Sequence, residues 1–318
     1  MVSFVAGSAL MQELAAVPVD PKQVERTVEA RGREVAADER RRVEPEPPAA
    51  PTICLGMDGT GVPMRVSELV GRAGKQPDGS AKTREGTLCT VWTAEGRADD
   101  GIPVRDPGSV SYSAAIESAA SRDTDTAPSA FAQRADREAR RRGFDQAARR
   151  VVLGDGALWI WNLADEQFPG AIQIVDLFHA KQHLSDVAKA IYGSGSDLSR
   201  PWTTQRHDEL DEGQVDAVLH ALRVHAEGND EARKCLDYVT RNQLRMRYPE
   251  FRAQGLCASS GVVEAGCKVV VGTRLKRAGM HWTVSGADAI IALRCCLLSG
   301  RFENFWERRS AAVGAGAR

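Results

Sequence analysis

Short apolar runs that end at an acidic residue recur along this chain and limit the folds open to it. Runs of this length, bounded by glycine or an acid, are typical of buried β-strands. The runs and the acids after them are Ile53 to Met57 with Asp58, Val151 to Leu153 with Asp155, and Ala171 to Val175 with Asp176. Ligands of α/β sheets bind beyond the carboxyl ends of the strands, so an acid there is well placed to contact a metal ion.

The remaining elements complete a mixed α/β pattern. Thr87 to Thr93 alternates β-branched and aromatic residues, which predicts another strand, and Val110 to Ile116 is a further candidate. Helices are predicted at Pro128 to Arg142, over Val215 to Ala226, from Ser259 through Val271, and from Ser285 through Leu298. This order predicts an α/β fold in which a mixed sheet is flanked by helices, with a helical insertion before the last helices.

The first fifty residues predict a short helical region followed by a connector. Asp20-Pro21 is a helix-start signature, because the Asp side chain can cap free N–H groups and proline suits the first helical position. With the apolar run from Ala9 to Val17, this gives a helix-turn-helix-like pair, which fits either a DNA reader or a helical hairpin docked on the core. Val43 to Pro51 contains four prolines, which favours an extended linker.

The chain is therefore divided into five predicted parts. They are a helical N-terminal region at 1–42, a proline-rich linker at 43–51, the first part of a catalytic core at 52–180, a helical insertion at 181–255, and the closing helices of the core at 256–318.

Composition excludes several classes of protein. The longest nearly apolar stretch, from Ala287 to Leu298, is interrupted by charged residues, whereas a membrane-spanning helix needs about 20 apolar residues. The N-terminus lacks the basic region of a secretory signal. Seven cysteines include no C-x-x-C pair, which argues against a zinc ribbon or a disulfide scaffold. We therefore expect a cytoplasmic protein.

The near-neutral total of 42 Lys+Arg against 43 Asp+Glu hides a segregation of charge. From Arg241 to Trp282 there are eight basic and two acidic residues, a net of +6, whereas Arg206 to Asp237 has four against nine, a net of −5. Phosphate binding needs a local basic surface, because each contact releases a condensed counterion. The basic segment is thus compatible with DNA.

Glu264 is the third candidate acid, and it lies among valines in SSGVVEAGCK. Its side chain either lies on the exposed face of an amphipathic helix or is directed at a charged partner in the core. Basic residues follow it, as expected where a phosphate backbone approaches a metal site. We predict DNA contacts for Lys268, Arg274, Lys276 and Arg277, and stacking of His281 and Trp282 on an unpaired base, although Trp282 also suits a core.

Three acids far apart in sequence suit phosphodiester chemistry. A two-metal mechanism needs two divalent cations about 3.5 to 4 Å apart, which clamp the attacking and leaving oxygens. Hard cations such as Mg²⁺ take carboxylate oxygens as ligands. Two Asp residues from adjacent strands and one Glu from a neighbouring helix can build such a pocket.

At these residues the sequence resembles DDE transposases of the ISKra type, a bacterial insertion-sequence family with an RNase H-like core. The resemblance runs in the family's order from about Ile53 to Trp306. The matching segments are ICLGMDGTGVPM around Asp58, VVLGDGALWIWN around Asp155, IVDLFHAKQHL around Asp176 and His179, and SSGVVEAGCKVVVGTRLKRAGMHWT around Glu264.

The resemblance implies a metal-binding triad of Asp58, Asp155 and Glu264 that holds two Mg²⁺ or Mn²⁺ ions. Asp176 and His179 match a (Cys/Asp)-x-x-His element, in which the His is expected to orient a phosphate or a strand. A zinc site at His179 and His183, or a plain helix-face role for these histidines, stays open. The implied partners are double-stranded DNA, as element ends and target, and further copies of the chain at the bacterial nucleoid.

The implied activity is cleavage at element ends followed by transfer of the 3′-OH into target DNA. Two alternatives stay open: a nuclease on the same core that cuts without joining, and an inactive transposase-derived protein that binds DNA. The second is included because family members usually begin with a fuller N-terminal DNA-binding region, so the resemblance leaves truncation of this chain open as an alternative.

Overall fold

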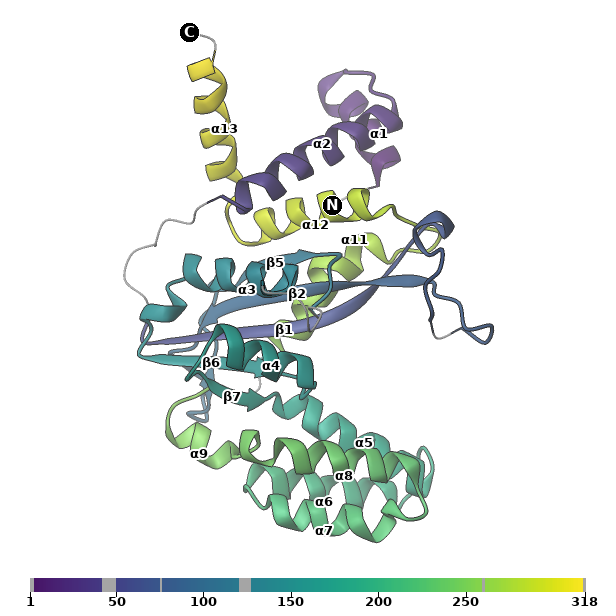
Figure 1. Ribbon diagram of the computed structural model, residues 1–318, viewed down its shortest axis with the longest axis vertical. Coiled ribbons are helices and arrows are strands. Elements are labelled where there is room, and N and C mark those ends of the chain that lie inside the picture. Colours follow the sequence, from purple (N-terminus) through teal and green to yellow (C-terminus); the bar gives the residue numbers. More distant parts are fainter. Residues whose placement is uncertain (1–2, 42–49, 75, 120–126, 259–260, 317–318) are drawn as a thin grey trace.

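A computed structural model of the chain describes residues 3–41, 50–74, 76–119, 127–258 and 261–316. A sheet occupies the middle of an elongated molecule, with a helical layer beyond each of its two edges (Figure 1). The predicted linker at 43–51 and the helix start at Ser259 and Ser260 lie largely outside the described residues.

The main sheet is mixed, as the order of elements predicts. Its order is β5-β2-β1-β6-β7, in which β5, β2 and β1 pair antiparallel and β1, β6 and β7 pair parallel. The strands are β1 Thr52–Pro63, β2 Thr83–Thr93, β5 Ser111–Ala115, β6 Arg149–Gly154 and β7 Ile172–Val175. A small ribbon of β3 Gly96–Arg97 and β4 Pro103–Val104 lies outside it.

Helices cover both faces of the sheet, which explains why consecutive residues of β1 and β2 are buried. On one face α3 packs on β2 and β5, and on the other α10 packs on β1 and β2. In Figure 1, α3 lies in front of the sheet and α11 behind it. These helices are α3 Ala130–Arg141, α4 Leu158–Gln167, α10 Val262–Gly266 and α11 Thr273–Leu275, with a π-helical segment η4 at Cys267–Gly272 between the last two.

Of the N-terminal helices, α2 Pro21–Glu39 packs on α12 Val284–Leu298, and α1 Phe4–Ala15 packs on α2; α13 Phe302–Gly316 follows α12. α2 begins where Asp20-Pro21 predicts, with the Asp20 carboxylate accepting the Lys22 N–H. Gly32 lets α2 approach α12 closely, since a Cβ there would lie 2.1 Å from the Ala289 carbonyl oxygen. The N-terminal region thus docks on the closing helices.

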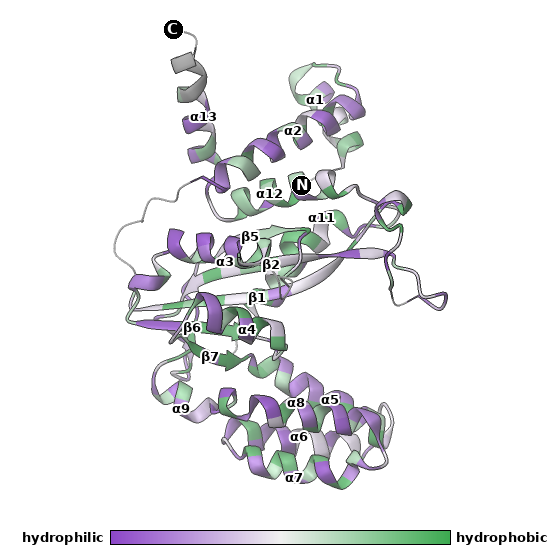
Figure 2. Cartoon of the chain, viewed as in Figure 1, coloured by the Kyte–Doolittle hydropathy of each residue, from purple (hydrophilic) through white to green (hydrophobic). Residues whose placement is uncertain are grey.

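The helical insertion lies beyond β7 at the opposite end of the molecule (Figure 1). Its helices are α5 Leu177–Tyr192, α6 Ser199–Asp211, α7 Val215–Ala226, α8 Asp230–Asn242 and α9 Tyr248–Ala253; the short 3-10 turns of the chain are η1 Val66–Glu68, η2 Phe144–Gln146 and η3 Gln243–Arg245. In Figure 2 these helices alternate between hydrophilic and hydrophobic residues, whereas β6 and β7 are mostly hydrophobic.

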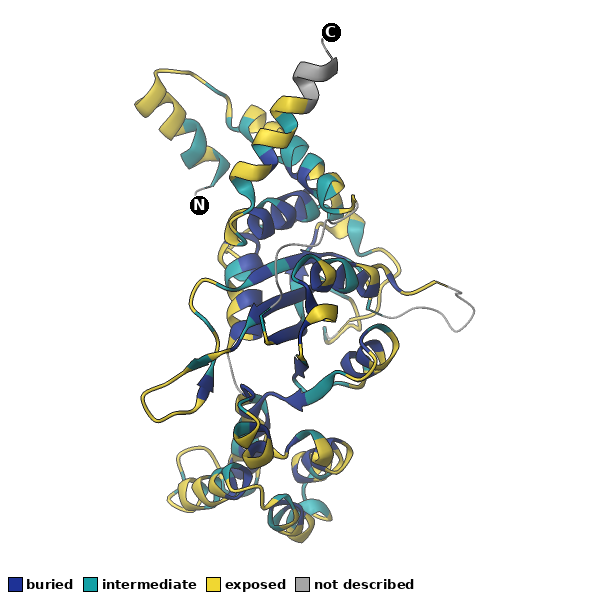
Figure 3. Cartoon of the chain, turned by 90° about the vertical axis from the view of Figure 1, so that its left-hand side faces the viewer, coloured by how far each residue is buried: buried dark blue, intermediate teal, exposed yellow. Residues whose placement is uncertain are grey.

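Burial is concentrated in the sheet and in the helices against it (Figure 3). A continuous apolar core joins β1, β6 and β7 to α3, α4 and the inner faces of the insertion. Within the described ranges, no helix is both long enough and apolar enough to cross a membrane.

The predicted end of the first strand was wrong. β1 continues past Asp58 to Pro63, and Asp58 pairs with Leu88 of β2 rather than forming a turn. The reason is that β2 begins at Thr83, earlier than its apolar pattern indicates, so antiparallel pairing extends through residues with little strand character.

Candidate active site

Three acids lie side by side where the parallel strand pairs β1–β6 and β6–β7 end, at the carboxyl end of the ladders. The β1–β6 ladder ends at the pair Gly56 and Leu153, and the β6–β7 ladder ends at Gly154 and Val175. Each of the acids stands one or two residues beyond these pairs. Asp58, Asp155 and Asp176 line one small pocket together with His179. The pocket therefore brings together Asp155 and Asp176, which follow β6 and β7, and Asp58, which lies within β1.

The pocket is narrow. The space open to the centre of a water-sized sphere is about 10 Å³, which is room for about one water molecule or small ion. The remaining lining consists of Met57, Leu153, Gly154 and Val263. The pocket thus combines apolar walls with acidic groups at one end.

Asp58 is held by two donors and is half-buried. Its carboxylate accepts the N–H of Gly59 at 2.6 Å and the S–H of Cys267 at 3.2 Å. Burial raises the pKa of the Asp58 carboxyl above its ordinary value, the two hydrogen bonds oppose that rise, and the nearby Asp155 adds to it. Ionised Asp58 is therefore energetically costly in this state.

Cys267 donates the hydrogen bond that links Asp58 to a helical segment outside its own strand. Burial raises the pKa of its thiol well above the usual range, and the neighbouring Asp58 raises it further, so the thiol stays protonated. It lies in η4, and its hydrogen bond connects this helical segment to β1. Sequence reasoning missed Cys267, although its spacing of three residues from Glu264 places it within one helical turn of a candidate acid.

Asp155 occupies the turn between β6 and α4. Its carboxylate accepts the N–H of Ala157 at 2.8 Å, and Gly156 follows with a φ of +98°, which favours glycine. None of the ion pairs among the described residues includes Asp58 or Asp155. Two neighbouring carboxylates with no basic side chain paired to them offer the oxygen ligands that a hard divalent cation such as Mg²⁺ or Mn²⁺ takes.

Asp176 and His179 enter the pocket from the start of α5. Asp176 is the N-cap of this helix, and its carboxylate accepts the N–H of Phe178 at 2.8 Å. His179 is one turn further along and meets the Phe178 ring edge-on. Asp176 thus has a capping role in addition to lining the pocket.

His183 does not join His179 in this pocket. Its ring lies 4.3 Å from the ring of Tyr238, and burial lowers its pKa. Among the described residues, no group of three or more His, Cys, Asp or Glu side chains has an arrangement that could hold a metal ion. The zinc alternative and the three-acid metal site both stay predictions.

Glu264 lies on α10 beside the pocket, and its side chain is exposed rather than part of the lining. The inward positions of this helix are taken by Val262 and Val263, and a Cβ on Gly56 would lie only 2.3 Å from Val263. The structure therefore brings Asp58 and Asp155 together and leaves Glu264 on the outer face of the adjacent helix.

The segment after Glu264 is a π-helix, whose hydrogen-bond pattern differs from that of an α-helix and which is frequent at functional sites. Arg294 of α12 donates from Nε to the carbonyl oxygens of Val269 at 3.1 Å and Val270 at 2.7 Å. These bonds satisfy polar groups that the altered helix exposes. Arg294 thus ties the helix that carries Glu264 to α12.

The predicted DNA-contacting residues divide into two groups. Lys268, Lys276, Arg277 and His281 are exposed. Arg274 and Trp282 are buried, so the expectation that they contact DNA was wrong. The Arg274 guanidinium lies over the rings of Phe4 and Trp282, and the Trp282 indole N–H donates to the Leu275 carbonyl at 3.0 Å. Both are packing residues between α1 and α11.

Comparison with known proteins supplies no family assignment. None of the protein-family models searched matches the chain, and a search of curated proteins finds no significant match.

Proposed function

We propose that this chain is a DNA transposase with an RNase H-like core, which cleaves DNA at element ends and transfers the resulting 3′-OH into target DNA. The observation that carries the proposal is the register of Asp58, Asp155 and Asp176 around one pocket. The order of the resembling motifs along the sequence is the second support. We place the protein on nucleoid DNA in the bacterial cytoplasm, acting as a multimer.

The sheet supports the core assignment. Three antiparallel strands followed by two parallel ones, with helices on both faces, provide the mixed α/β scaffold that an RNase H-like core requires. Asp58 lies within the central strand β1, which is paired on both sides, Asp155 directly follows β6, and Asp176 directly follows the edge strand β7. A rigid scaffold of this kind can hold ligands to a bound cation in fixed geometry.

The residues of the pocket have distinct proposed roles. Asp58 and Asp155 hold Mg²⁺ or Mn²⁺, and such ions polarise the scissile phosphate and the attacking oxygen. His179 orients the phosphate from the start of α5. Lys268, Lys276 and Arg277 contact the DNA backbone, since their side chains are exposed close to η4. A cation would also offset the effect of burial, which raises the pKa of Asp58, and the smaller repulsion from Asp155.

Glu264 completes the proposed ligand set only if α10 turns or unwinds, because its side chain now lies on the outer face. The π-helical segment that begins at Cys267 already departs from α-helical register, and such segments are frequent at functional sites. The pocket has room for about one ion in this state. The second ion of the predicted pair would require the rearranged state.

The test uses DNA that carries the sequences bordering the coding region, incubated with Mg²⁺ or Mn²⁺. We expect wild type to cut and join this DNA, and we expect Asp58→Ala to abolish both steps while DNA retention stays largely intact. Asp165→Ala is the matched control, because Asp165 is an exposed acid on α4 outside the pocket. Cleavage by Asp58→Ala at the wild-type rate would contradict the assignment.

A non-catalytic DNA-binding protein is the second candidate, and the exposed position of Glu264 favours it. Glu264→Gln separates the two, since it should abolish cleavage by a transposase and change nothing in a protein that only binds DNA. A nuclease would cut the same DNA yet fail to join a pre-cut end, which a strand-transfer assay with such an end would reveal.

A further inference from the structure

The helical insertion contacts the loop that carries Asp155. From α8, the Tyr238 Oη–H donates to the main-chain carbonyl of Asp155 at 2.8 Å, and the Asn242 Nδ2–H donates to the carbonyl of Gly156 at 3.2 Å. These two donors are one helical turn apart on the same face of α8. They reach successive carbonyl groups just beyond the end of β6.

Both donors are fixed in place. The Asn242 amide is 1% exposed, its oxygen accepts the Trp161 indole N–H at 2.9 Å, and its nitrogen also donates to the Tyr238 carbonyl at 3.0 Å. The Tyr238 ring is buried and lies against His183. Since the side-chain oxygen and nitrogen of Asn242 both have partners, its orientation is determined by the network.

The loop is shaped to receive these side chains. Gly156 has a φ of +98°, and a Cβ there would lie 2.4 Å from the Tyr238 ring. A residue with a side chain would therefore be strained at this position and would also displace Tyr238. The contact between α8 and the loop therefore depends on Gly156 in the loop and on Tyr238 in α8.

The chemistry of the two donors suits a site for a cation. Tyr238 and Asn242 are uncharged, and they bind main-chain carbonyls rather than the carboxylate of Asp155. An arginine or lysine in their place would also fix the loop, but it would compete with a cation for Asp155. Neutral donors fix the main chain and leave the carboxylate charge available.

We propose that Tyr238 and Asn242 are positioning residues, which fix the main chain of Asp155 so that its carboxylate faces Asp58. The insertion then helps to shape the pocket through the loop that carries Asp155. This inference rests on the proposed function for its purpose, although the clamp itself can be tested without any nucleic acid.

The experiment compares Tyr238→Phe with Tyr248→Phe. Both tyrosines are buried in the helical insertion, but the Tyr248 hydroxyl has no hydrogen-bond partner in the described part of the chain, so Tyr248→Phe removes a hydroxyl at no cost in hydrogen bonding. Amide hydrogen exchange is measured over residues 153–158 in the full chain. We expect exchange about fivefold faster in Tyr238→Phe, which corresponds to about 1 kcal/mol for one lost hydrogen bond, and no change in Tyr248→Phe.

Mn²⁺ binding, measured by calorimetry on the same proteins, is the second readout. We expect the dissociation constant to rise about tenfold in Tyr238→Phe, the lower range for loss of an outer partner of a metal ligand, and to be unchanged in Tyr248→Phe. Wild-type exchange in Tyr238→Phe would overturn the clamp. Faster exchange with unchanged Mn²⁺ affinity would overturn its positioning role. Absence of Mn²⁺ binding by wild type would instead contradict the proposed function, with the exchange result still deciding the clamp.

Discussion

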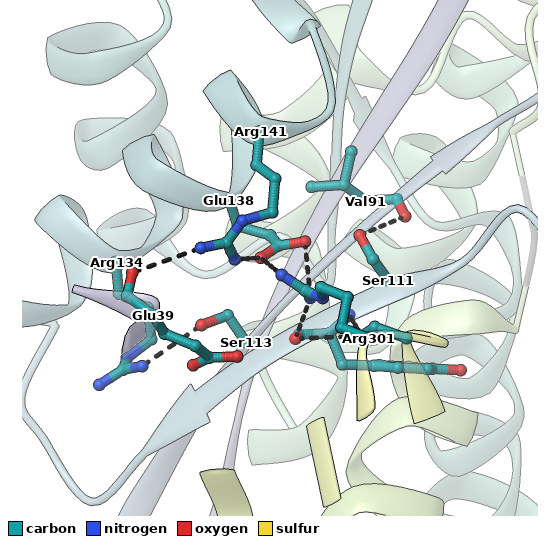
Figure 4. Close-up of polar contacts among 10 residues, drawn as sticks. Glu39, Val91, Ser111, Ser113, Arg134, Glu138, Arg141 and Arg301 are labelled. Carbon is teal, nitrogen blue, oxygen red and sulfur yellow. Dashed lines mark hydrogen bonds and ion pairs between the residues drawn. The ribbon is translucent and has the colours of Figure 1, made fainter. Parts of the chain in front are cut away.

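Asp58 and Glu138 both lie against the same sheet, Asp58 half-buried and Glu138 fully buried, but their surroundings differ. The Glu138 carboxylate on α3 accepts from Arg141 at 2.8 Å and from Arg301 at 3.0 and 3.1 Å (Figure 4). From the described residues, Asp58 accepts only the Gly59 N–H and the Cys267 S–H. One acid is neutralised by two arginines, and the other has no basic partner among the described ion pairs.

The pKa values of the two acids are shifted in opposite directions. Burial alone would raise the pKa of Glu138, but Arg301 and Arg141 outweigh it and hold that pKa below its ordinary range. At Asp58 burial prevails, and the pKa rises. A fold that can supply two arginines to one buried acid leaves the other uncompensated. Such uncompensated charge is typical of sites that bind a ligand or a metal, rather than of sites that stabilise the fold.

The largest test of this contrast is the stability of Glu138→Gln. The substitution keeps the shape of the side chain but removes the carboxylate paired with Arg141 and Arg301, so we expect a loss of about 3–5 kcal/mol in the free energy of unfolding. Asp58→Asn should change that free energy by less than about 1 kcal/mol, and in the stabilising direction, because it removes a half-buried charge that has no basic partner among the described ion pairs.

Both free energies are measured by urea unfolding at neutral pH with EDTA present. EDTA removes divalent ions, which would otherwise stabilise wild type alone. If Asp58→Asn were as destabilising as Glu138→Gln, the two acids would have the same structural role, and the contrast would fail.

Most of the sheet could be predicted from sequence because β6 and β7 are short apolar runs with a clear end. The acids after them, Asp155 and Asp176, lie where such runs place them. The position of Asp58 could not be read in this way. The strand that carries it continues to Pro63, and this extension is stabilised by pairing with β2 rather than by any local apolar pattern.

The closing helices were harder to predict because valines both precede and follow Glu264 in the sequence. Helical spacing alone does not decide which of them face the sheet, and the structure directs Val262 and Val263 inward. Likewise, the basic run gives no sign that Arg274 packs on Phe4, which is distant in sequence. Local sequence patterns determine elements, whereas faces depend on partners from elsewhere in the chain.

The pH dependence of stability provides a second, smaller test, in which the two acids should differ in sign. Glu138 has a lowered folded pKa, so its stabilising effect is present above the ordinary value of 4.5 and is lost as pH falls through the folded pKa. Asp58 has a raised folded pKa, so folded protein binds its proton more tightly, and stability falls as pH rises from 3.8 through the folded pKa.

Unfolding free energies of wild type, Glu138→Gln and Asp58→Asn, measured from about pH 3 to 7 in EDTA, check this prediction. The cost of Glu138→Gln should shrink as pH falls below 4.5. The free energy of unfolding of Asp58→Asn should increase relative to that of wild type as pH rises above 3.8. The titratable groups that face Asp58 are Asp155, His179 and Cys267. Parallel pH profiles for the two variants would contradict the assigned directions.

The smallest expected effect concerns Cys267. This residue is an uncharged donor to Asp58, whereas the donors to Glu138 are arginines. A thiol is a weak donor, so we expect Cys267→Ala to cost about 1 kcal/mol more than Cys235→Ala, which removes a buried thiol that donates to no carboxylate in the hydrogen bonds of the described residues. Urea unfolding at neutral pH in EDTA measures both. Cys267→Ser, which restores a donor, should recover part of the loss. Equal costs for the two alanine variants would mean that the thiol only fills space. A larger cost for Cys267→Ala would mean that a weak, uncharged donor holds Asp58 in place and leaves its charge free for a cation.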